Sequence, residues 1–427
     1  MRTFTFKSLF LTVLFVLLGC LTIQAADDDL ITKQITIKLD EAGTLPNKIG
    51  SSKKYLITNL KIIGEINGTD LRMIREMAGS DYFMYKTDGE LSILDLSDAK
   101  IVKGGSSYIG ISYIDEGAYR YREVYTSNDE IGEYAFEGCS GLTSLTLPDG
   151  ITSISDCAFE GCSGLTSINL PAGITSIGSL AFTYCSGLTN LTIPDGITSI
   201  SDYAFHGCSG LTSLTLPAGI TSIGSSTFSD CSGLTSLNLP AGITEIGDGA
   251  FMNCSGLTSL NLPAGITSIN DDTFRGCSGL TSLNLPAGIT EIGEGAFSDC
   301  CGLTSLNLPA GITSIGCEAF YCCSGLTSIY VYSDKVPYID GAFDGCDANK
   351  CTVYVPKGTY DDYCLSEFRY FENIVEFDAT GIDKTTTPTD VEEVSRYSVN
   401  GQRLVGPTKG LNIVKYSDGS VKKVVVE

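Results

Sequence analysis

The sequence predicts a mixed, β-rich solenoid: a right-handed leucine-rich repeat array of about ten 23-residue coils with N- and C-terminal caps. Three observations predict it. A cysteine recurs every 23 residues, a phenylalanine recurs three residues before each cysteine, and a leucine recurs three residues after it. A fixed period of about 20 to 29 residues is typical of a leucine-rich solenoid, in which each unit buries its apolar face only by stacking on its neighbours.

One unit, Leu211 to Gly233, illustrates the expected coil: LTSLTLPAGITSIGSSTFSDCSG. The spacing L-x-x-L-x-L sends alternate side chains inward, as a short strand does. Pro217 and Gly219 then turn the chain, because proline cannot donate to a strand ladder and glycine tolerates positive φ. A second extended piece at Ile220 to Ile223 precedes a tight turn that carries Phe228 and Cys231.

The recurring phenylalanines and cysteines are assigned a structural role, because equivalent positions of stacked coils point the same way. We expect the cysteine side chains to be buried free thiols, since pairing all of them would strain every coil. Among the additional cysteines an occasional disulfide stays open, at Cys300, Cys301, Cys317, Cys322 and Cys323. The first six members of each ladder are Phe136, Phe159, Phe182, Phe205, Phe228 and Phe251, and Cys139, Cys162, Cys185, Cys208, Cys231 and Cys254.

The N-terminus predicts export. A basic start and an apolar run from Leu9 to Leu18 precede the small residue Ala25, so residues 1–25 are expected to be a secretory signal peptide. Leu17 to Cys20 also fit a bacterial lipoprotein box, which keeps open a lipid anchor at Cys20. The run is too short for a membrane span, and we expect no direct span elsewhere.

Caps and a separate tail are expected around the array. The N-terminal cap, 26–130, contains strand, helix and strand patterns and a degenerate repeat, at Tyr55 to Ile66, Leu71 to Met77 and Leu91 to Ile101. The solenoid proper is placed at 131–346. The remaining predicted parts are a C-terminal cap at 347–379 with a turn or helix near Tyr360 to Phe371, a polar linker at 380–390 and a β domain at 391–427.

The repeated unit LTSLxLPxGITSIGxxAFxxCSG, with the segment YLITNLKIIGEINGTDLRMIREMAG before it, resembles the BspA-like class of bacterial leucine-rich repeats over residues 30–377. The resemblance implies a surface or secreted adhesin that binds host matrix proteins or other microbes. The C-terminal β domain resembles the sorting domain of type IX secretion cargo, which implies secretion machinery as a partner. Asn400-Gly401 and Asp418-Gly419 are hairpin turn signals in it, whereas Asn412 stands where that family has an aromatic residue.

Charge and composition exclude several functions. The net charge is -23, which disfavours binding to nucleic acid and to anionic membranes. His206 is the only histidine, so a His-Glu-x-x-His zinc site is excluded, and its variable repeat position suggests an exposed residue. The acidic residues, Glu245 and Glu291 among them, are expected to form a scattered solvating face, and Asn270 to Asp272 lack a calcium loop's glycine. We therefore expect no enzyme, no cofactor and no metal.

Candidate ligand-binding residues are the outward-facing positions of the first strand of each coil. Repeated amides and hydroxyls at fixed spacing suit a repetitive ligand such as an extended peptide or a glycan, although they also suit exposed strands and stacked amide ladders. Two tyrosines interrupt these rows and are either a contact hot spot or a cap on the solenoid edge. The candidates are Asn169, Asn238, Asn261, Asn284, Asn307, Tyr330 and Tyr332.

Adhesion through an extracellular protein ligand is thus the leading hypothesis. A glycan-binding accessory protein and a passive surface spacer are the alternatives. Aromatic platforms along one face would favour the glycan, and a purified solenoid without any ligand would favour the spacer.

Overall fold

The computed structural model describes residues 29–115 and 118–379 and, towards the C-terminus, strands at 393–398, 403–404, 410–416 and 421–426. The predicted signal peptide (1–25) and linker (380–390) lie outside these residues. The chain divides into two compact units, Met1–Phe377 and Asp378–Glu427, and each is described by itself.

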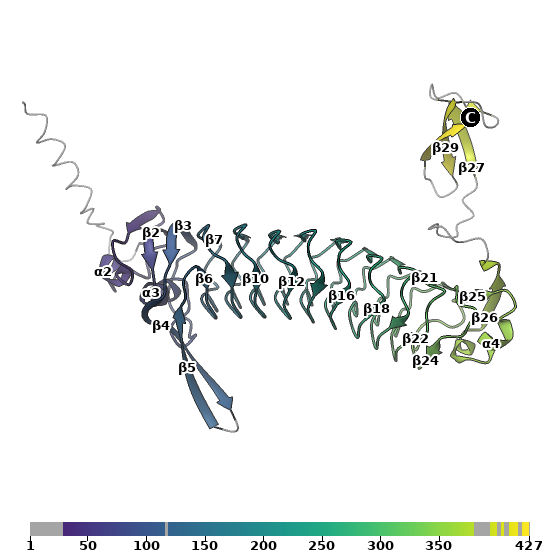
Figure 1. The fold of residues 1–427 in the computed structure, drawn as a ribbon, viewed down its shortest axis with the longest axis horizontal. Coiled ribbons are helices and arrows are strands. Elements are labelled where there is room, and N and C mark those ends of the chain that lie inside the picture. The colour runs from purple at the N-terminus through teal and green to yellow at the C-terminus, as the bar shows by residue number, and fades with distance from the viewer. Residues whose placement is uncertain are drawn as a thin grey trace, which may run out of the picture. The chain divides into compact units, whose positions relative to one another are not determined.

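The first unit is the predicted solenoid (Figure 1), and its first face is a series of short parallel strands in one-coil register, such as Ser259↔Ser282. In the described residues fourteen strands follow one another on this face. The prediction of about ten coils was too low, because strands of both caps continue the stack. The strands are β1 (Ile35–Lys38), β2 (Asn59–Ile66), β3 (Ile93–Ile101), β7 (Ser144–Thr146), β9 (Ser167–Asn169), β11 (Asn190–Thr192), β13 (Ser213–Thr215), β15 (Leu237–Asn238), β17 (Ser259–Asn261), β19 (Ser282–Asn284), β21 (Ser305–Leu308), β23 (Ser328–Val331), β25 (Thr352–Pro356) and β26 (Asn373–Phe377).

A second face is built from the shorter extended piece that follows each proline turn. Its isoleucines point inward and are buried, while the preceding serine, glutamate or, at Tyr338, tyrosine points outward. The strands are β6 (Glu130–Ile131), β8 (Ser153–Ile154), β10 (Ser176–Ile177), β12 (Ser199–Ile200), β14 (Ser222–Ile223), β16 (Glu245–Ile246), β18 (Ser268–Ile269), β20 (Glu291–Ile292), β22 (Ser314–Ile315) and β24 (Tyr338–Ile339).

The remaining side of each coil is the turn that carries the phenylalanine and the cysteine. From Phe136 to Phe343 the rings stack one coil on the next, with centroids 4.9–5.6 Å apart and planes within 13° of parallel. The rings from Phe136 to Phe320 are fully buried, so this stack forms one edge of a continuous core.

From Cys162 onward, each ladder cysteine satisfies a backbone group of the coil before it. The thiol of Cys162 donates to the carbonyl of Phe136 at 3.1 Å, and the same bond recurs up to Cys346 at 3.1–3.3 Å. Burial raises the thiol pKa, for Cys208 to about 12. All sixteen cysteines of the described residues are free thiols, including those that crowd the coils near Cys300.

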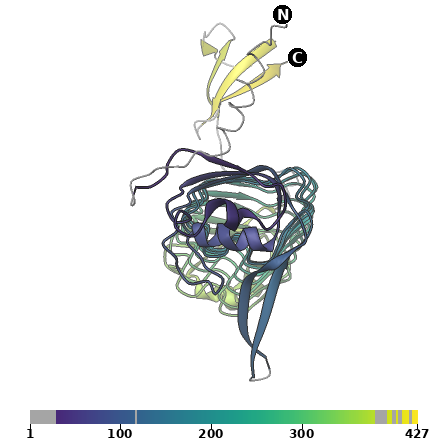
Figure 2. The same ribbon diagram turned by 90° about the vertical axis from the view of Figure 1, so that its left-hand side faces the viewer.

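The N-terminal cap contains the predicted strand, helix and strand, as β2, α3 (Gly68–Met77) and β3. Helix α3 begins in a capping box: the Asn67 side chain accepts from the N–H of Thr69 and the Asp70 carboxylate accepts from the N–H of Asn67. With the short helix α2 (Leu45–Ile49), it lies across the end of the solenoid (Figure 2). The two helices therefore cover the apolar end of the first coils.

A long antiparallel hairpin leaves this cap, and the sequence analysis did not predict it. Strands β4 (Gly104–Asp115) and β5 (Ala118–Thr126) form a separate two-stranded sheet that extends away from the coils (Figures 1 and 2). Of its described side chains, Tyr108, Ile109 and Val124 at the root are buried.

The C-terminal cap contains the predicted strand, helical turn and closing strand: β25, then α4 (Tyr360–Cys364) and a 3-10 turn η1 (Glu367–Tyr370), then β26. Tyr363 is buried and its hydroxyl donates to the carbonyl of Ser333 at 2.7 Å. This bond holds the helical turn onto the last coils.

The second unit contains a four-stranded antiparallel sheet in the order β28-β27-β29-β30. Both predicted hairpin pairings are present: β27 with β28, and β29 with β30. The turn residues Asn400, Gly401, Asp418 and Gly419 lie outside the described residues. The strands are β27 (Glu393–Ser398), β28 (Arg403–Leu404), β29 (Gly410–Tyr416) and β30 (Val421–Val426).

Candidate functional site

The predicted amide row lies on the outward side of the first face. Asn238, Asn261 and Asn284 occupy equivalent positions of consecutive coils and are exposed. No amide-to-amide hydrogen bond joins them within the part of the chain that the structure describes, so their polar groups face solvent. Asn169 is also exposed but lies apart, because Thr192 and Thr215 occupy the intervening coils.

Towards the C-terminal cap the row becomes less accessible. Asn307 is half-buried, and its side-chain oxygen is buried without a hydrogen-bond partner. The next position is Tyr330, whose ring stacks on Tyr354 with centroids 4.4 Å apart. Phe377 lies edge-on to both Tyr330 and Tyr332, at 5.8 and 5.4 Å. The contacts of the two tyrosines are thus with the cap, and each ring stays half-buried.

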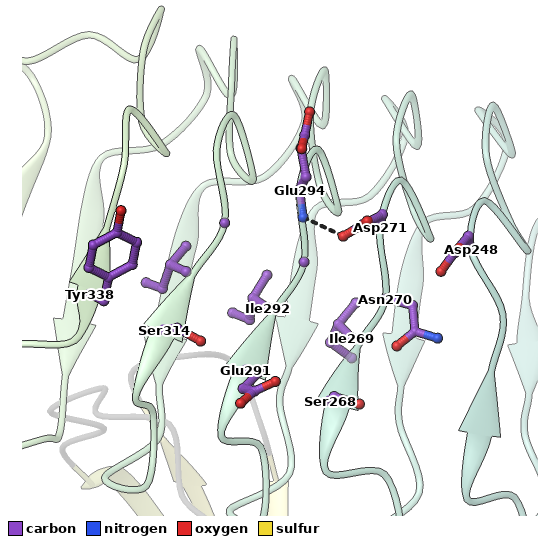
Figure 3. Close-up of a pocket in the computed structure, with 13 residues that line it drawn as sticks. Asp248, Ser268, Ile269, Asn270, Asp271, Glu291, Ile292, Glu294, Ser314 and Tyr338 are labelled. Atoms are coloured by element: carbon purple, nitrogen blue, oxygen red, sulfur yellow. Dashed lines mark hydrogen bonds between the residues drawn. The ribbon is translucent and has the colours of Figure 1, made fainter.

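The second face carries a shallow groove of about 510 Å³ across β18, β20, β22 and β24. Four carboxylates line it, with Asp248 at one end and the exposed ring of Tyr338 at the other (Figure 3). The other three are Asp271, Glu291 and Glu294. The Oδ1 atom of Asp271 accepts from the backbone N–H of Glu294 at 2.7 Å, which fixes one wall. No lysine, arginine or histidine lines the groove.

This groove corrects the expectation of scattered carboxylates. Asp248, Asp271 and Glu294 are separated by 23 residues each, so stacking places them in one column. The 23-residue period of the sequence would have been enough to predict this column of carboxylates. Tyr338 was missed because its coil is one residue longer, as the step from Ser314 to Tyr338 is 24 residues.

His206 differs from its predicted exposed position. Its side chain is only 17% exposed and lies edge-on to Tyr184 and Tyr203, with ring centroids 5.2 and 5.9 Å away. Its Nδ1 atom is buried without a hydrogen-bond partner, 3.8 Å from the Asp230 carboxylate.

Two other features are absent from the described residues. Within these ranges no group of three or more histidine, cysteine, aspartate or glutamate side chains is arranged to hold a metal ion. No helix in the same ranges is long and apolar enough to cross a membrane. The amide row and the acidic groove both lie on outward faces of the first unit.

Solved structures with similar repeats come from several bacteria. A leucine-rich repeat protein from Bacteroides ovatus is 27% identical over 59% of this chain and 82% of that chain, with a TM-score of 0.39. A leucine rich cell surface protein from Faecalibacterium prausnitzii is 25% identical over 58% and 76%, with a TM-score of 0.33. A T. pallidum leucine-rich repeat protein is 34% identical over 41% and 71%, with a TM-score of 0.32. No curated protein matches the chain.

A family profile covers more than half of the sequence. It describes the BspA type leucine rich repeat region and matches six copies over residues 129–258 and 244–372. These residues contain the stacked phenylalanines, the thiol ladder and both faces of the solenoid. The chain therefore belongs to the BspA-type leucine-rich repeat family.

Proposed function

We propose that this protein is a surface-displayed or secreted protein-binding module that acts in adhesion, and that its ligand is an extracellular protein of the host matrix or of another microbe. One observation carries the proposal: the coil interior is filled by apolar side chains and thiols, whereas the outward positions form two long, regular, open faces. Extended solenoid faces of this kind serve as binding surfaces for large partners.

Two further points support it. The family consists of repeat proteins, and one similar solved structure is described as a cell surface protein. The solenoid surface is also strongly acidic, because Arg275 is the only lysine or arginine between Arg122 and Lys335. Such a surface repels anionic lipid and nucleic acid and leaves proteins and neutral glycans as ligands.

The test is binding of the purified full chain to immobilised fibronectin, laminin and collagen. The triple variant Asn238→Ala, Asn261→Ala, Asn284→Ala removes the exposed amide row, and Ser176→Ala, Ser199→Ala, Ser222→Ala is the matched control on the second face. Loss of binding in the first variant alone supports the proposal. Binding to a glycan array but to no protein would replace it with the glycan-binding alternative, and binding to neither would favour a spacer.

Export is the second part of the proposal. We propose that Asp378–Glu427 is the sorting domain read by a type IX secretion system, which the two antiparallel hairpin pairings of its sheet support. Deletion of this unit should move the protein from the cell surface or medium to the periplasm. Mass spectrometry of the mature N-terminus then separates cleavage after Ala25 from acylation of Cys20.

A further inference from the structure

Two tyrosines and the only histidine of the chain meet on the turn side of the coils. The ring of His206 lies edge-on to Tyr184 of the preceding coil and to Tyr203 of its own coil, with centroids 5.2 and 5.9 Å away. Tyr184 and Tyr203 are 56% and 44% exposed, whereas the His206 side chain is only 17% exposed. These three residues, the aromatic cluster, therefore offer a ligand two accessible rings in contact with a covered one.

Both tyrosines stand at left-handed positions of the backbone. Tyr184 and Tyr203 each have a φ of 57°, a conformation in which a bulky side chain is strained. At the repeat position of Tyr184, five of the ten repeats have glycine, among them Gly161 and Gly207 in the neighbouring coils. Glycine would make the same turn without strain. A strained residue at a position where glycine fits is typical of a functional site.

The next coil holds the Tyr184 ring in place. The backbone N–H of Tyr184 donates to the carbonyl of His206 at 2.8 Å. The ring lies so close to Gly207 that a Cβ atom there would come within 2.5 Å of its Cδ1 atom. Gly207 thus leaves the room that this ring occupies. A ring that is fixed before a ligand arrives loses little conformational entropy on binding, which strengthens the binding.

A carboxylate continues this row on the following coil. Asp230 occupies the repeat position of Gly207, 23 residues further along the chain. The coils are 5.5 Å apart here, as the stacked rings of Phe205 and Phe228 show. The Asp230 carboxylate is therefore about one coil spacing from the Tyr184 ring that lies against Gly207. A cation that pairs with this carboxylate can lie within the ~6 Å over which cations interact with an aromatic face.

Asp230 has hydrogen-bonding neighbours but no lysine or arginine partner among the described residues. Its Oδ1 atom accepts from the side-chain amide of Asn253 at 2.9 Å, and its Oδ2 atom is 3.8 Å from Nδ1 of His206. Arg275, the lysine or arginine nearest to Asp230 in the sequence, pairs with Asp272 instead. The Asp230 side chain is 44% exposed on a strongly acidic solenoid. It therefore attracts a positive charge from outside.

We propose that the aromatic cluster and Asp230 bind an arginine side chain of the partner protein, whose guanidinium stacks on an exposed tyrosine ring and pairs with the Asp230 carboxylate. A guanidinium fits both parts, because its planar face packs on aromatic rings and its N–H groups donate to carboxylates in a fixed geometry. The ligand is thus a protein with an exposed arginine rather than a neutral glycan. This inference rests on the proposed function and adds the chemistry of one contact, away from the amide row.

The test follows the ring protons of His206 by NMR in the full chain, because the chain has no second histidine. N-acetyl-arginine amide is the probe. N-acetyl-citrulline amide is the control, since it has nearly the same shape without the charge, and both are titrated at one fixed pH. We expect the arginine compound to shift the His206 signals with a dissociation constant on the order of 1 mM, and the citrulline compound to bind about tenfold more weakly.

Two variants remove parts of the site and keep the turn. Tyr184→Gly deletes the ring and introduces the residue that five other repeats have at this position. Asp230→Asn deletes the charge and keeps an oxygen that accepts from the Asn253 amide. Each should weaken binding of the arginine compound about tenfold. Tyr321→Ala is the matched control, because it removes another partly exposed tyrosine from the turn side of a distant coil and should change nothing.

Binding to the immobilised matrix proteins separates this site from the proposed function. A matrix protein that binds the unmodified chain should bind the Tyr184→Gly variant about tenfold more weakly. If none binds, the adhesion proposal fails, and the arginine titration still tests this site. Equal binding of the arginine and citrulline compounds, or unchanged arginine binding in both variants, would overturn the inference. So would His206 shifts that neutral sugars cause and the arginine compound does not, because the ligand would then be a glycan.

Discussion

At the scale of single residues, Glu137 stands out because stacking places a carboxylate where water reaches it poorly. Its Oε2 atom is buried without a hydrogen-bond partner, and Glu160 occupies the same position of the next coil. Burial, and then repulsion from Glu160, raise the pKa of Glu137 from 4.5 to about 7. The fold therefore favours the neutral form of this side chain.

Glu137→Gln should remove a pH dependence of stability. Between pH 4.5 and about 7 the folded chain holds a proton that the unfolded chain has lost, so the free energy of unfolding falls as pH rises through this window. Above it the glutamine variant should be more stable by about 1 to 2 kcal/mol, a value reduced because the side chain is only half-buried. Urea unfolding at pH 5 and pH 8 measures this, and an equal difference at both pH values would contradict it.

The thiols make a second prediction. Cys301 and Cys317 are exposed, whereas the ladder thiols are buried. A thiol reagent such as dithionitrobenzoate should thus modify Cys301 and Cys317 in the native protein, and the ladder should react only in guanidinium chloride. Mapping of the modified peptides checks this. Rapid native modification of Cys208 or Cys231 would show that the coils open readily.

The sequence specified the ladders well because a period repeats the same environment at every coil. Phe136 to Phe320 and their cysteines are buried as one column each, as the 23-residue step implies. The sequence predicted less about side chains whose neighbours lie outside the 23-residue repeats. Whether Tyr330 faced solvent or a cap depended on Phe377, which lies 47 residues further along the chain and outside any repeat.

At the scale of the coil, the backbone turn before each phenylalanine is left-handed. In each of the ten repeats from Phe136 to Phe343 one residue has φ between 51° and 61°, and three of the ten are glycine: Tyr134, Cys157, Leu180, Tyr203, Ser226, Gly249, Asp272, Gly295, Glu318 and Gly341. Residues other than glycine are strained in this left-handed conformation, because the Cβ atom comes close to the following carbonyl oxygen. The coil geometry thus overrides local preference at most of these positions, which explains why glycine recurrence did not reveal the turn.

Removing a glycine from this turn and adding one should change the free energy of unfolding in opposite directions. Gly249→Ala should destabilise by about 1 kcal/mol, because alanine resists a φ of 60°, and the exposed Glu318→Gly should stabilise by about as much. Gly219→Ala is the control, since a Cβ atom there has no neighbour within 4 Å and its φ is not positive. The denaturant midpoints of the three variants, compared with that of the unmodified protein, measure these changes. A loss in Gly219→Ala as large as in Gly249→Ala would refute the backbone explanation.

The hairpin is the element that sequence patterns missed. Its strands lie outside the 23-residue repeats, and a regular alternation of apolar and polar residues covers only Tyr119 to Arg122. Pairing depends on contacts that the local pattern does not contain. These are above all the hydrogen bond from the N–H of Gly110 to the carbonyl of Tyr82, and the one between the hydroxyls of Tyr82 and Tyr121. A fixed period identifies repeated units, but an insertion that occurs only once produces no periodic signal.

At the scale of the whole molecule, the solenoid is a one-dimensional stack in which each coil contacts mainly its neighbours. Its free energy of unfolding is then approximately the sum of a contribution from each coil and one from each interface between neighbouring coils. Covering the two ends therefore matters more for stability than it does in a globular core. The C-terminal end is closed by β26, Tyr363 and Phe368, all within the first unit. The second unit begins at Asp378 and forms its own sheet.

Two truncations should therefore behave differently. Ending the chain after Phe377 removes only the second unit and should leave the thermal midpoint of the solenoid unchanged. Ending it after Lys350 removes β25, α4 and β26, strips Tyr330 of Tyr354 and Phe377, and exposes the Phe343 ring. Exposing a large apolar side chain that was buried costs about 1.5 to 3 kcal/mol.

Differential scanning calorimetry of the full chain and both truncations measures the effect, with limited proteolysis to locate the first opening. We expect the shorter chain to lose its last coils first, so that cleavage begins near Cys323 and proceeds towards the N-terminus, because a stack unfolds from an uncapped end. Equal midpoints for both truncations would mean that the cap adds nothing. A lower midpoint after removal of the second unit alone would mean that Asp378–Glu427 packs on the solenoid and stabilises it.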